Sequence, residues 1–460
     1  MATADRPNLL FVFSDQHRWC DLGCYGNPEV RTPNFDRFAA SALRFTRCIS
    51  NSPLCVPARG TMMTGLMPLR HGAFTNDLPM RPGVTSIADV LGRAGYHTGY
   101  IGKWHLAGVP RDQAIPPGER RFGFREWKVC NCNHRYLNAY YYDEDGRRID
   151  IEGYEPVAQT DLAVDFITRN RGPRPWFLAL SWGPPHDPYD QVPASFLNEY
   201  AGRELALRPN VPEVVHPNLR RTIGKPQVLE MLRGYYAHIT ALDEQFGRLI
   251  EALENTGQLA NTVVVYTSDH GDMLGSQGYT NKQLPFEESI RVPLLVRWDG
   301  AIPAATTDEL IGLVDLPVSL AGLLGLEFPG EVDGMDLHRT FLDPAQPTRE
   351  SCYIFDLVPC HQAAARGGTE WRGLRTRRYT FARTARDEGF MLYDNETDPF
   401  QMRNLIDDPA YAEVRARLRE ELDRYIRRHD ALLPWDRLIV EYGFRDAWNE
   451  SQAYFGLPLL

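Results

Sequence analysis

Three continuous apolar runs predict buried strands of one sheet. They cover residues 8–14, 175–182 and 262–268, and each is apolar on both of its faces. This pattern is typical of parallel strands that are covered by helices on both sides. We expect further strands in the same region at 45–49, 96–101 and 294–297.

Helices are predicted between these strands, and the pattern of apolar and polar residues changes after residue 345. Apolar residues recur at helical spacing over 227–255, and shorter helices are expected at 32–39, 85–91 and 161–167. After residue 345, short alternating segments at 353–356, 372–383 and 390–394 predict a small antiparallel sheet, followed by a charged amphipathic helix at 409–430.

These elements predict an α/β protein with a large, mostly parallel sheet flanked by helices. We expect a catalytic domain over residues 1–345. A smaller α+β domain with an antiparallel sheet, a helix and an extended tail is expected over 346–460.

Composition limits the classes of partner. The formal net charge is −10, which argues against nucleic acid or an anionic membrane as the main partner. No apolar run approaches the roughly 18 residues of a membrane span. The first residues lack a charged region followed by an apolar one, so we expect no secretion signal and a cytoplasmic protein. In such a compartment the eight cysteines should be reduced thiols.

Polar side chains follow two of the buried strands directly. Asp15 and Gln16 come after the first run, and Asp269 and His270 come after the third. Ligands of open α/β sheets bind outside the carboxyl ends of the strands, where these four side chains could meet at one cation. Taken alone, an acidic residue after a strand is more often a helix cap.

Four other basic side chains are candidates, and three of them lie at or near strand ends. Lys103 and His105 follow the strand at 96–101 and point the same way, because side chains alternate along extended chain. His186 stands among prolines after the second run, where it could serve a site or only a rigid turn. Lys282 lies in a loop, where a lysine is usually solvated.

The stretch 53–60 contains the most specific signal. A helix is expected to begin at Pro57, with Cys55 just outside its positive end and Arg59 on its first turn. Such a place can hold an anion or a negatively charged nucleophile, although Cys-x-Pro-x-Arg alone fits a buried cysteine equally well. Extended through Gly60 to Thr64-Gly65, the stretch closely resembles the signature of the formylglycine-dependent (type I) sulfatases, a family of the alkaline phosphatase superfamily.

The resemblance covers nearly the whole chain and implies a mechanism. Cys55 would be oxidised to formylglycine by a maturation enzyme, and its hydrate would attack a sulfate ester of a small molecule or saccharide. The implied catalytic residues are Cys55, Arg59, Lys103, His105, His186 and Lys282, with His105 as base and His186 or Lys282 as acid. The implied ligands of one divalent cation are Asp15, Gln16, Cys55, Asp269 and His270. Calcium is expected first, with magnesium or manganese as alternatives.

One departure from the family pattern leaves alternatives open. Many sulfatases have Asp-Asp and Asp-Asn where this chain has Asp15-Gln16 and Asp269-His270. The pattern seen here also occurs in choline-sulfatases and phosphonate monoester hydrolases. The intact Lys-x-His pair favours sulfate. A phosphonate monoester or phosphodiester hydrolase remains the alternative, and a catalytically silent binding protein is a third reading.

Two segments have no role in this scheme yet. Residues 108–155 look like an insertion over the sheet that selects the substrate. Its Cys130, Cys132 and His134 could suggest zinc, but four properly spaced ligands are missing. The tail at 434–460 is rich in aromatic residues and leucine without clear periodicity. It should dock on its own domain or on another subunit, which would make the protein a homo-oligomer.

Overall fold

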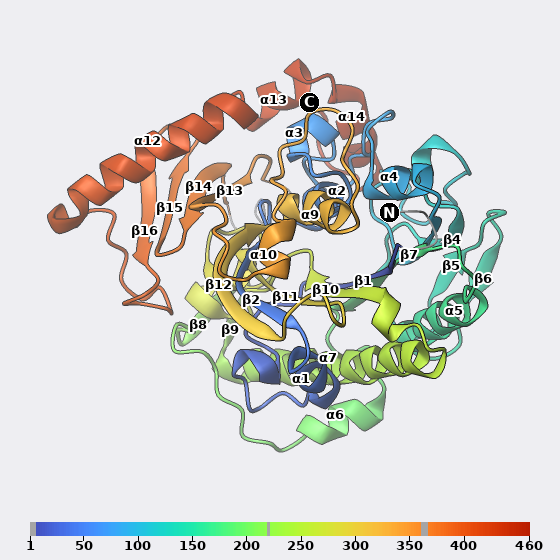
Figure 1. Cartoon of the computed structure of the whole chain (residues 1–460). Helices are drawn as coiled ribbons and strands as arrows, with labels where there is room; N and C mark the ends of the chain where they lie inside the picture. The colour runs from blue at the N-terminus through green and yellow to red at the C-terminus, as the bar shows by residue number, and fades with distance from the viewer. Residues whose placement is uncertain (1–5, 219–220, 360–366) are drawn as a thin grey trace.

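A ten-stranded sheet runs through the centre of the computed structural model, which describes residues 6–218, 221–359 and 367–460 (Figure 1). The strand order is β12-β2-β11-β10-β1-β7-β3-β4-β5-β6. The strands are β1 Asn8–Asp15, β2 Leu43–Ile49, β3 His97–Lys103, β4 Glu126–Cys130, β5 Tyr140–Tyr142, β6 Arg148–Asp150, β7 Trp176–Pro185, β10 Thr262–Ser268, β11 Arg291–Arg297 and β12 Ala305–Gly312.

The middle of this sheet is parallel. β1 pairs in parallel with β10 and β7, β7 with β3, and β3 with β4. β11 runs antiparallel to both β10 and β2. The carboxyl ends of β10, β1, β7 and β3 therefore lie along one edge, which confirms the predicted architecture.

Helices cover both faces of the sheet because the central strands are apolar on both sides. Leu9, Phe11 and Phe13 of β1 share a core with α2, α4 and α9, whereas Leu10 and Val12 share the opposite core with α1, α5 and α7. The bounds are α1 Pro33–Ala39, α2 Cys55–Thr64, α4 Ile87–Arg93, α5 Glu155–Arg169, α7 Lys225–Asn255 and α9 Leu316–Leu323. Shorter helices are α3 Pro68–His71, α6 Ala194–Tyr200, α8 Glu287–Ile290 and α10 His338–Leu342, and β8 Val214–Asn218 pairs with β9 Arg221–Gly224.

The C-terminal region contains the predicted antiparallel sheet and helix. The strands β13 Ser351–Asp356, β14 Trp371–Thr376, β15 Tyr379–Thr384 and β16 Gly389–Asp394 pair in this order, and α12 Ala412–His429 packs on them. The boundary at residue 345 stays a prediction.

The tail differs from its prediction because it is largely helical. It contains α13 Trp435–Glu441 and α14 Arg445–Tyr454. Their apolar residues, among them Leu438 and Trp448, share a core with Met67 and Phe74 after α2, so the tail docks on its own chain. The homo-oligomer remains a prediction.

The insertion at 108–155 was expected to lie over the sheet, and this is wrong in part. It supplies β4, β5 and β6, which extend the sheet beyond β3. The parallel pairing of β4 with β3 carries the segment after Cys130 to the same edge as the end of β3.

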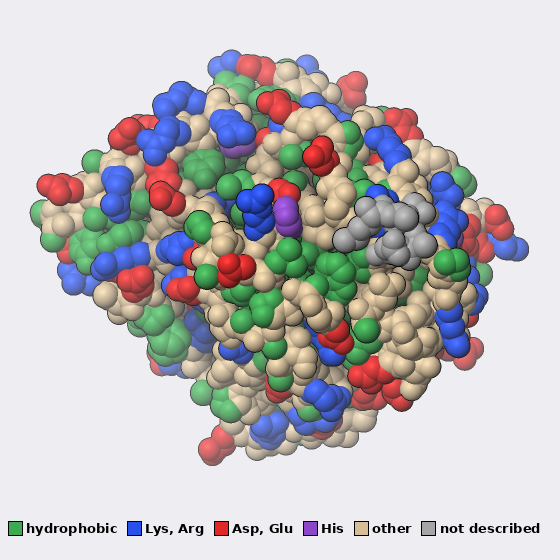
Figure 2. All heavy atoms as spheres, in the orientation of Figure 1, with side chains coloured by type: hydrophobic (Ala, Val, Ile, Leu, Met, Phe, Trp, Pro, Cys, Tyr) green, Lys and Arg blue, Asp and Glu red, His purple; other side chains and the backbone are tan. Residues whose placement is uncertain are grey.

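The surface and the thiols agree with an ordinary globular protein. Lys and Arg side chains are interspersed with Asp and Glu on the face in Figure 2. Among the described residues, no helix combines the length and apolar character of a membrane span. Seven cysteines are free thiols, and Cys360 lies outside the described residues.

Candidate active site

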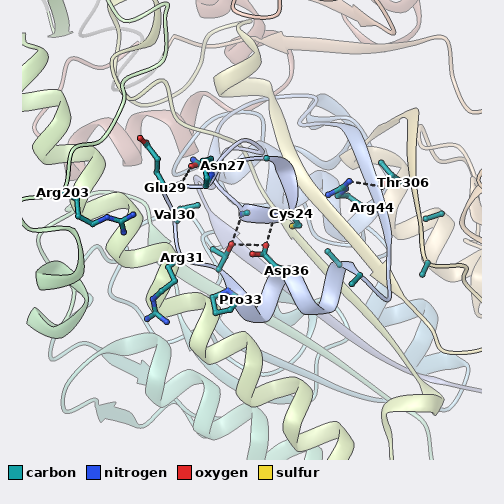
Figure 3. Close-up of a pocket in the computed structure, with 18 residues that line it drawn as sticks. Cys24, Asn27, Glu29, Val30, Arg31, Pro33, Asp36, Arg44, Arg203 and Thr306 are labelled. Atoms are coloured by element: carbon teal, nitrogen blue, oxygen red, sulfur yellow. Dashed lines mark hydrogen bonds between the residues drawn. The ribbon is translucent and has the colours of Figure 1, made fainter.

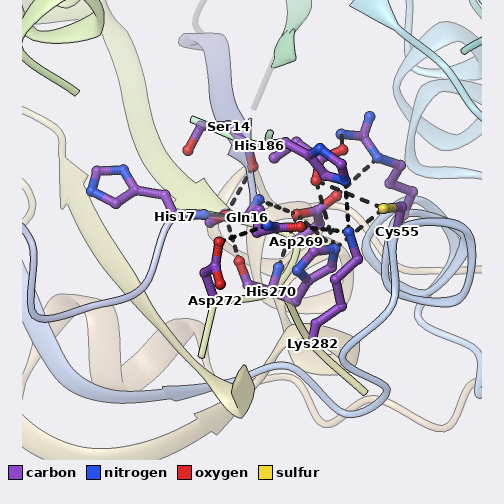
Figure 4. Close-up of polar contacts among 12 residues, drawn as sticks. Ser14, Gln16, His17, Cys55, His186, Asp269, His270, Asp272 and Lys282 are labelled. Carbon is purple, nitrogen blue, oxygen red and sulfur yellow. Dashed lines mark hydrogen bonds and ion pairs between the residues drawn. The ribbon is translucent and has the colours of Figure 1, made fainter. Parts of the chain in front are cut away.

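The edge formed by the carboxyl ends of the central strands gathers the predicted site residues. Asp15 ends β1 and Lys103 ends β3, whereas Asp269 and His270 follow β10 directly. These residues, with Gln16, Cys55, Arg59, His105, His186 and Lys282, are each at most 3% exposed. Figure 4 shows side chains from these separate elements converging.

Cys55 is the first residue of α2, so the predicted start at Pro57 is two residues too late. Its Sγ lies 3.3 Å from Nε2 of His270 and 3.7 Å from Oδ1 of Asp15. Burial alone would raise the pKa of the Cys55 thiol, but the ammonium groups of Lys282 and Lys103 lower it well below its usual range.

Close packing explains the glycines of the same stretch. A Cβ on Gly60 would lie 2.5 Å from the ring of His71. Gly65 caps the helix with a φ of 67°, a conformation that other residues rarely adopt. The helix that presents Cys55 thus needs both glycines.

Arg59 lies one turn after Cys55 in α2 and contacts several parts of the cluster. Its Nε donates to Oδ2 of Asp269 at 3.0 Å, and its Nη2 donates to Oδ2 of Asp15 at 3.1 Å. Its Nη1 donates to the carbonyl of Lys103 and to Oγ of Ser181, both at 2.8 Å. A buried guanidinium with four such acceptors fixes α2 relative to β1, β3, β7 and the segment after β10.

Two lysines approach the cluster from different sides. Nζ of Lys103 donates to Oδ2 of Asp15 at 2.6 Å. Nζ of Lys282 lies 2.5 Å from Oε1 of Gln16 and 2.7 Å from Nε2 of His186. Lys282 is therefore buried in the cluster and not solvated, and His186 lies directly beside it.

His105 is held by its backbone at the entry of the insertion. Its φ is 61°, and its N–H donates to the carbonyl of Asn131 at 2.6 Å. Burial by itself would lower the pKa of His105, but the negative charge of the Cys132 sulfur, whose own pKa is lowered well below its usual range, and the Asp77 carboxylate raise it to about 10.

The structure adds residues that the site prediction did not include. His134 stacks on His186 with 4.4 Å between ring centroids, and its Nε2 lies 3.5 Å from Nζ of Lys103. Asp272 accepts from Nε2 of Gln16 at 2.7 Å. The sequence suggested Cys132 and His134 only as zinc ligands. They are two residues apart after one strand, as Lys103 and His105 are at the end of the neighbouring strand, and this shared spacing could have identified them as site residues.

The cluster fits a divalent cation. In the part of the chain that the structure describes, Asp15, Cys55, Asp269 and His270 form the one such group whose ligand atoms lie within 4.8 Å of one another. Oδ1 of Asp15 and Oδ1 of Asp269 lie 3.6 and 3.7 Å from Nε2 of His270. Burial and the nearby Asp15 carboxylate raise the pKa of Asp269, a repulsion that a cation would remove.

Within the described ranges, Cys130, Cys132 and His134 do not form a second group of this kind. A hollow of about 980 Å³ lies elsewhere, between α1 and the start of β12 (Figure 3). Its lining, which includes Arg31, Arg44 and Arg203, contains none of the predicted site residues.

Comparison with known proteins gives one family. The sulfatase family model matches residues 7–326, and a model described as N-sulphoglucosamine sulphohydrolase, C-terminal, matches residues 275–428. An ulvan-active sulfatase of Formosa agariphila is 34% identical over 91% of this chain and 81% of its own length. An endo-4-O-sulfatase of Bacteroides thetaiotaomicron is 30% identical over 94% of both chains.

A solved structure agrees with these matches. The sulfatase candidate yidJ of Bacteroides fragilis superposes with a TM-score of 0.83 at 28% identity, covering 93% of this chain and 97% of its own. The geometry and the comparisons lead to one conclusion: this chain belongs to the sulfatase family and is a sulfuric ester hydrolase.

Proposed function

We propose that this sulfatase cleaves a sulfate ester of a saccharide, with residue 55 converted to formylglycine as the nucleophile. The observation that carries the proposal is the meeting of Cys55 with Lys103, Lys282 and the Asp15/Asp269 pair in one buried cluster. Oxidised and hydrated, residue 55 would have two hydroxyl groups, one to attack sulfur and one to expel sulfate as the aldehyde forms again.

The cationic side chains suit an ester that is an anion. Lys103 and Lys282 supply positive charge locally in a protein whose net charge is −10. In a water-excluded site such charges stabilise developing negative charge far more than they do in water. Arg59, whose four hydrogen bonds all go to protein groups, would hold the two carboxylates in place.

Proton transfer would fall to the two histidines and Lys282. His186 or Lys282, which lie 2.7 Å apart, would protonate the departing alcohol. His105 would take the proton of the second hydroxyl of residue 55. That role needs a lower pKa than the unmodified site provides. Conversion of Cys55 would remove its hydrogen bond to the ring, which is one of the contacts that raise the pKa of His105.

The cation would be held by Asp15, Asp269, His270 and residue 55, with Gln16 as a further ligand. It would draw electron density from the sulfuryl oxygens. Carboxylate and amide oxygens favour calcium or magnesium, whereas the imidazole of His270 favours manganese or another transition ion. We propose calcium first.

A saccharide substrate is supported by the relatives and by the place of the insertion. The C-terminal family model is named for N-sulphoglucosamine sulphohydrolase, and one relative is an endo-4-O-sulfatase. His134 of the insertion is partly exposed above the buried His186, where it would meet the alcohol part of the ester. A cytoplasmic location is proposed on the sequence alone.

A phosphonate monoester hydrolase remains the second candidate, because Gln16 and His270 match a pattern that also occurs in those enzymes. One experiment separates the two functions. The protein is co-expressed with a formylglycine-generating enzyme and assayed with a panel of sulfated saccharides, an aryl sulfate and an aryl phosphonate. We expect the highest kcat/KM with a saccharide sulfate, and no turnover in Cys55→Ala. A clear preference for the phosphonate would overturn the proposal.

Mass spectrometry of the peptide over residues 48–70 accompanies the assay. We expect the mass of formylglycine at position 55 in the active preparation. If the active preparation contains only unmodified cysteine, the proposed nucleophile is wrong.

A further inference from the structure

The side chain of His105 lies next to a buried ion pair that the proposed reaction does not use. Oδ1 of Asp77 lies 3.6 Å from Nε2 of His105, a distance for charge attraction and too long for a hydrogen bond. Neither ring nitrogen of His105 has a hydrogen bond of normal length among the described residues. The orientation of the ring therefore depends on packing and on the charges around it.

Asp77 is itself held firmly. Arg111 donates to both of its carboxylate oxygens, from Nε at 2.7 Å and from Nη2 at 2.8 Å. The Asp77 side chain is 0% exposed, and its backbone has a φ of 67°, which is uncommon outside glycine. A two-point ion pair of this kind fixes the direction of the carboxylate as well as its position.

The pair also lies next to the C-terminal tail. Arg111 belongs to the insertion, and its guanidinium lies 4.8 Å from the ring centre of Phe455 in the C-terminal tail. Asp77 follows α3. The guanidinium that holds Asp77 thus also packs against the C-terminal tail.

We propose that Asp77, held by Arg111, is a positioning residue that keeps the imidazole of His105 directed at residue 55. The inference rests on the proposed role of His105 as the base that completes turnover. An anionic carboxylate beside Nε2 favours the ring orientation that places this nitrogen next to it, and this leaves the other nitrogen for residue 55. Without the carboxylate the ring would face the unpaired Arg111 guanidinium, which repels a ring that gains a proton.

The test compares Asp77→Asn with Asp143→Asn in the fully matured enzyme. Asp143 accepts from Nε of Arg147 at 3.1 Å on the same insertion, so its variant is a matched control outside the site. For Asp77→Asn we expect alcohol release in the first turnover to stay within about threefold of the parent. Steady-state kcat should fall about 10- to 100-fold, since a misplaced group can cost that much. Asp143→Asn should change neither.

Two further measurements distinguish a positioning role of Asp77 from a purely structural one. Under turnover, the peptide that carries residue 55 should retain a sulfuryl group in Asp77→Asn, as seen by mass spectrometry. In the His105→Ala background, Asp77→Asn should lower kcat no further, because a positioning residue acts only through the residue that it positions. A purely structural role would slow the first turnover as well and would add to the loss in His105→Ala.

The outcomes separate this inference from the function on which it rests. If His105→Ala slows the first turnover and retains no sulfuryl group, the role of His105 itself is wrong. If His105→Ala behaves as expected but Asp77→Asn lowers kcat further in the His105→Ala background, Asp77 does not position the base.

If Asp77→Asn fails to fold, Arg111→Lys tests the same inference, because it keeps the positive charge but loses the two-point ion pair with Asp77. A roughly 3- to 10-fold loss of kcat with the same retained sulfuryl group is expected, and unchanged turnover overturns the inference.

Discussion

Replacing Lys103 by alanine should slow the first chemical step without unfolding the site. Nζ of Lys103 donates to Oδ2 of Asp15 at 2.6 Å, but the same oxygen also accepts from Arg59 at 3.1 Å. Asp15 therefore keeps a cationic partner in the variant, and no buried carboxylate is left unpaired. The usual large cost of breaking a buried ion pair is avoided for this reason.

The expected loss follows from what Lys103 would do to the ester. It is a buried ammonium group, 3% exposed, at the point where a sulfuryl oxygen would gain charge. Removal of one such preorganised donor costs about 2.7–4 kcal/mol, or about 10²- to 10³-fold in rate. Lys103→Met should show the same loss, because it keeps the volume and removes only the charge. Lys225→Ala, which removes a 39% exposed lysine paired with Glu213, is the control and should have no effect on rate.

Rapid-quench kinetics with a chromogenic sulfate measures the step directly. The first-turnover rate constant should fall with Lys103→Ala, while metal content and the thermal unfolding midpoint stay near those of the parent. A loss below about tenfold in the first turnover, or a loss confined to later turnovers, would show that Lys103 does not act on the sulfuryl group.

Three further predictions test the metal, the acid and the C-terminal contact. Metal analysis should find about one divalent cation per chain, with loss in Asp15→Ala or Asp269→Ala, and full retention in both would refute the site. Lys282→Ala should slow hydrolysis of an alkyl sulfate far more than that of a nitrophenyl sulfate, because a poor leaving group needs a proton. Equal losses would argue against Lys282 as acid. Burial alone would raise the pKa of Glu287, but Arg375, at 2.6 Å, lowers it from 4.5 to about 2. Because the pKa is lower in the folded state, the pair stabilises the fold above pH 4.5 and its contribution is lost as the pH falls to about 2. Denaturant unfolding of Glu287→Gln should therefore show a loss of about 3 kcal/mol at pH 7 that shrinks toward pH 2, and a pH-independent difference would contradict this.

Local patterns in the sequence were sufficient for six of the ten strands of the sheet and for half of the site. A strand that is apolar on both faces predicts a buried parallel sheet, and polar residues at its carboxyl end must lie at the edge where ligands bind. Asp15, Asp269 and His270 could be placed in this way, and Cys55 and Arg59 could be identified from a short motif on one helix turn. The physical reason is that side-chain periodicity and helix polarity act over a few residues, so they can be predicted from residues that are close together in the sequence.

The rest depended on which segments meet in space. The register that pairs Ser14 with Ser268 sets Asp15 beside Asp269, and no local pattern specifies it. Lys282 looks like a solvated loop residue until the fold brings it to Gln16 and His186. The tail at 434–460 has no clear pattern because its helices bury apolar residues against α3 and its surroundings as well as against their own sheet. The contact of Asp77 with His105 has the same origin, since it joins two segments whose distance along the chain says nothing about their distance in the folded protein.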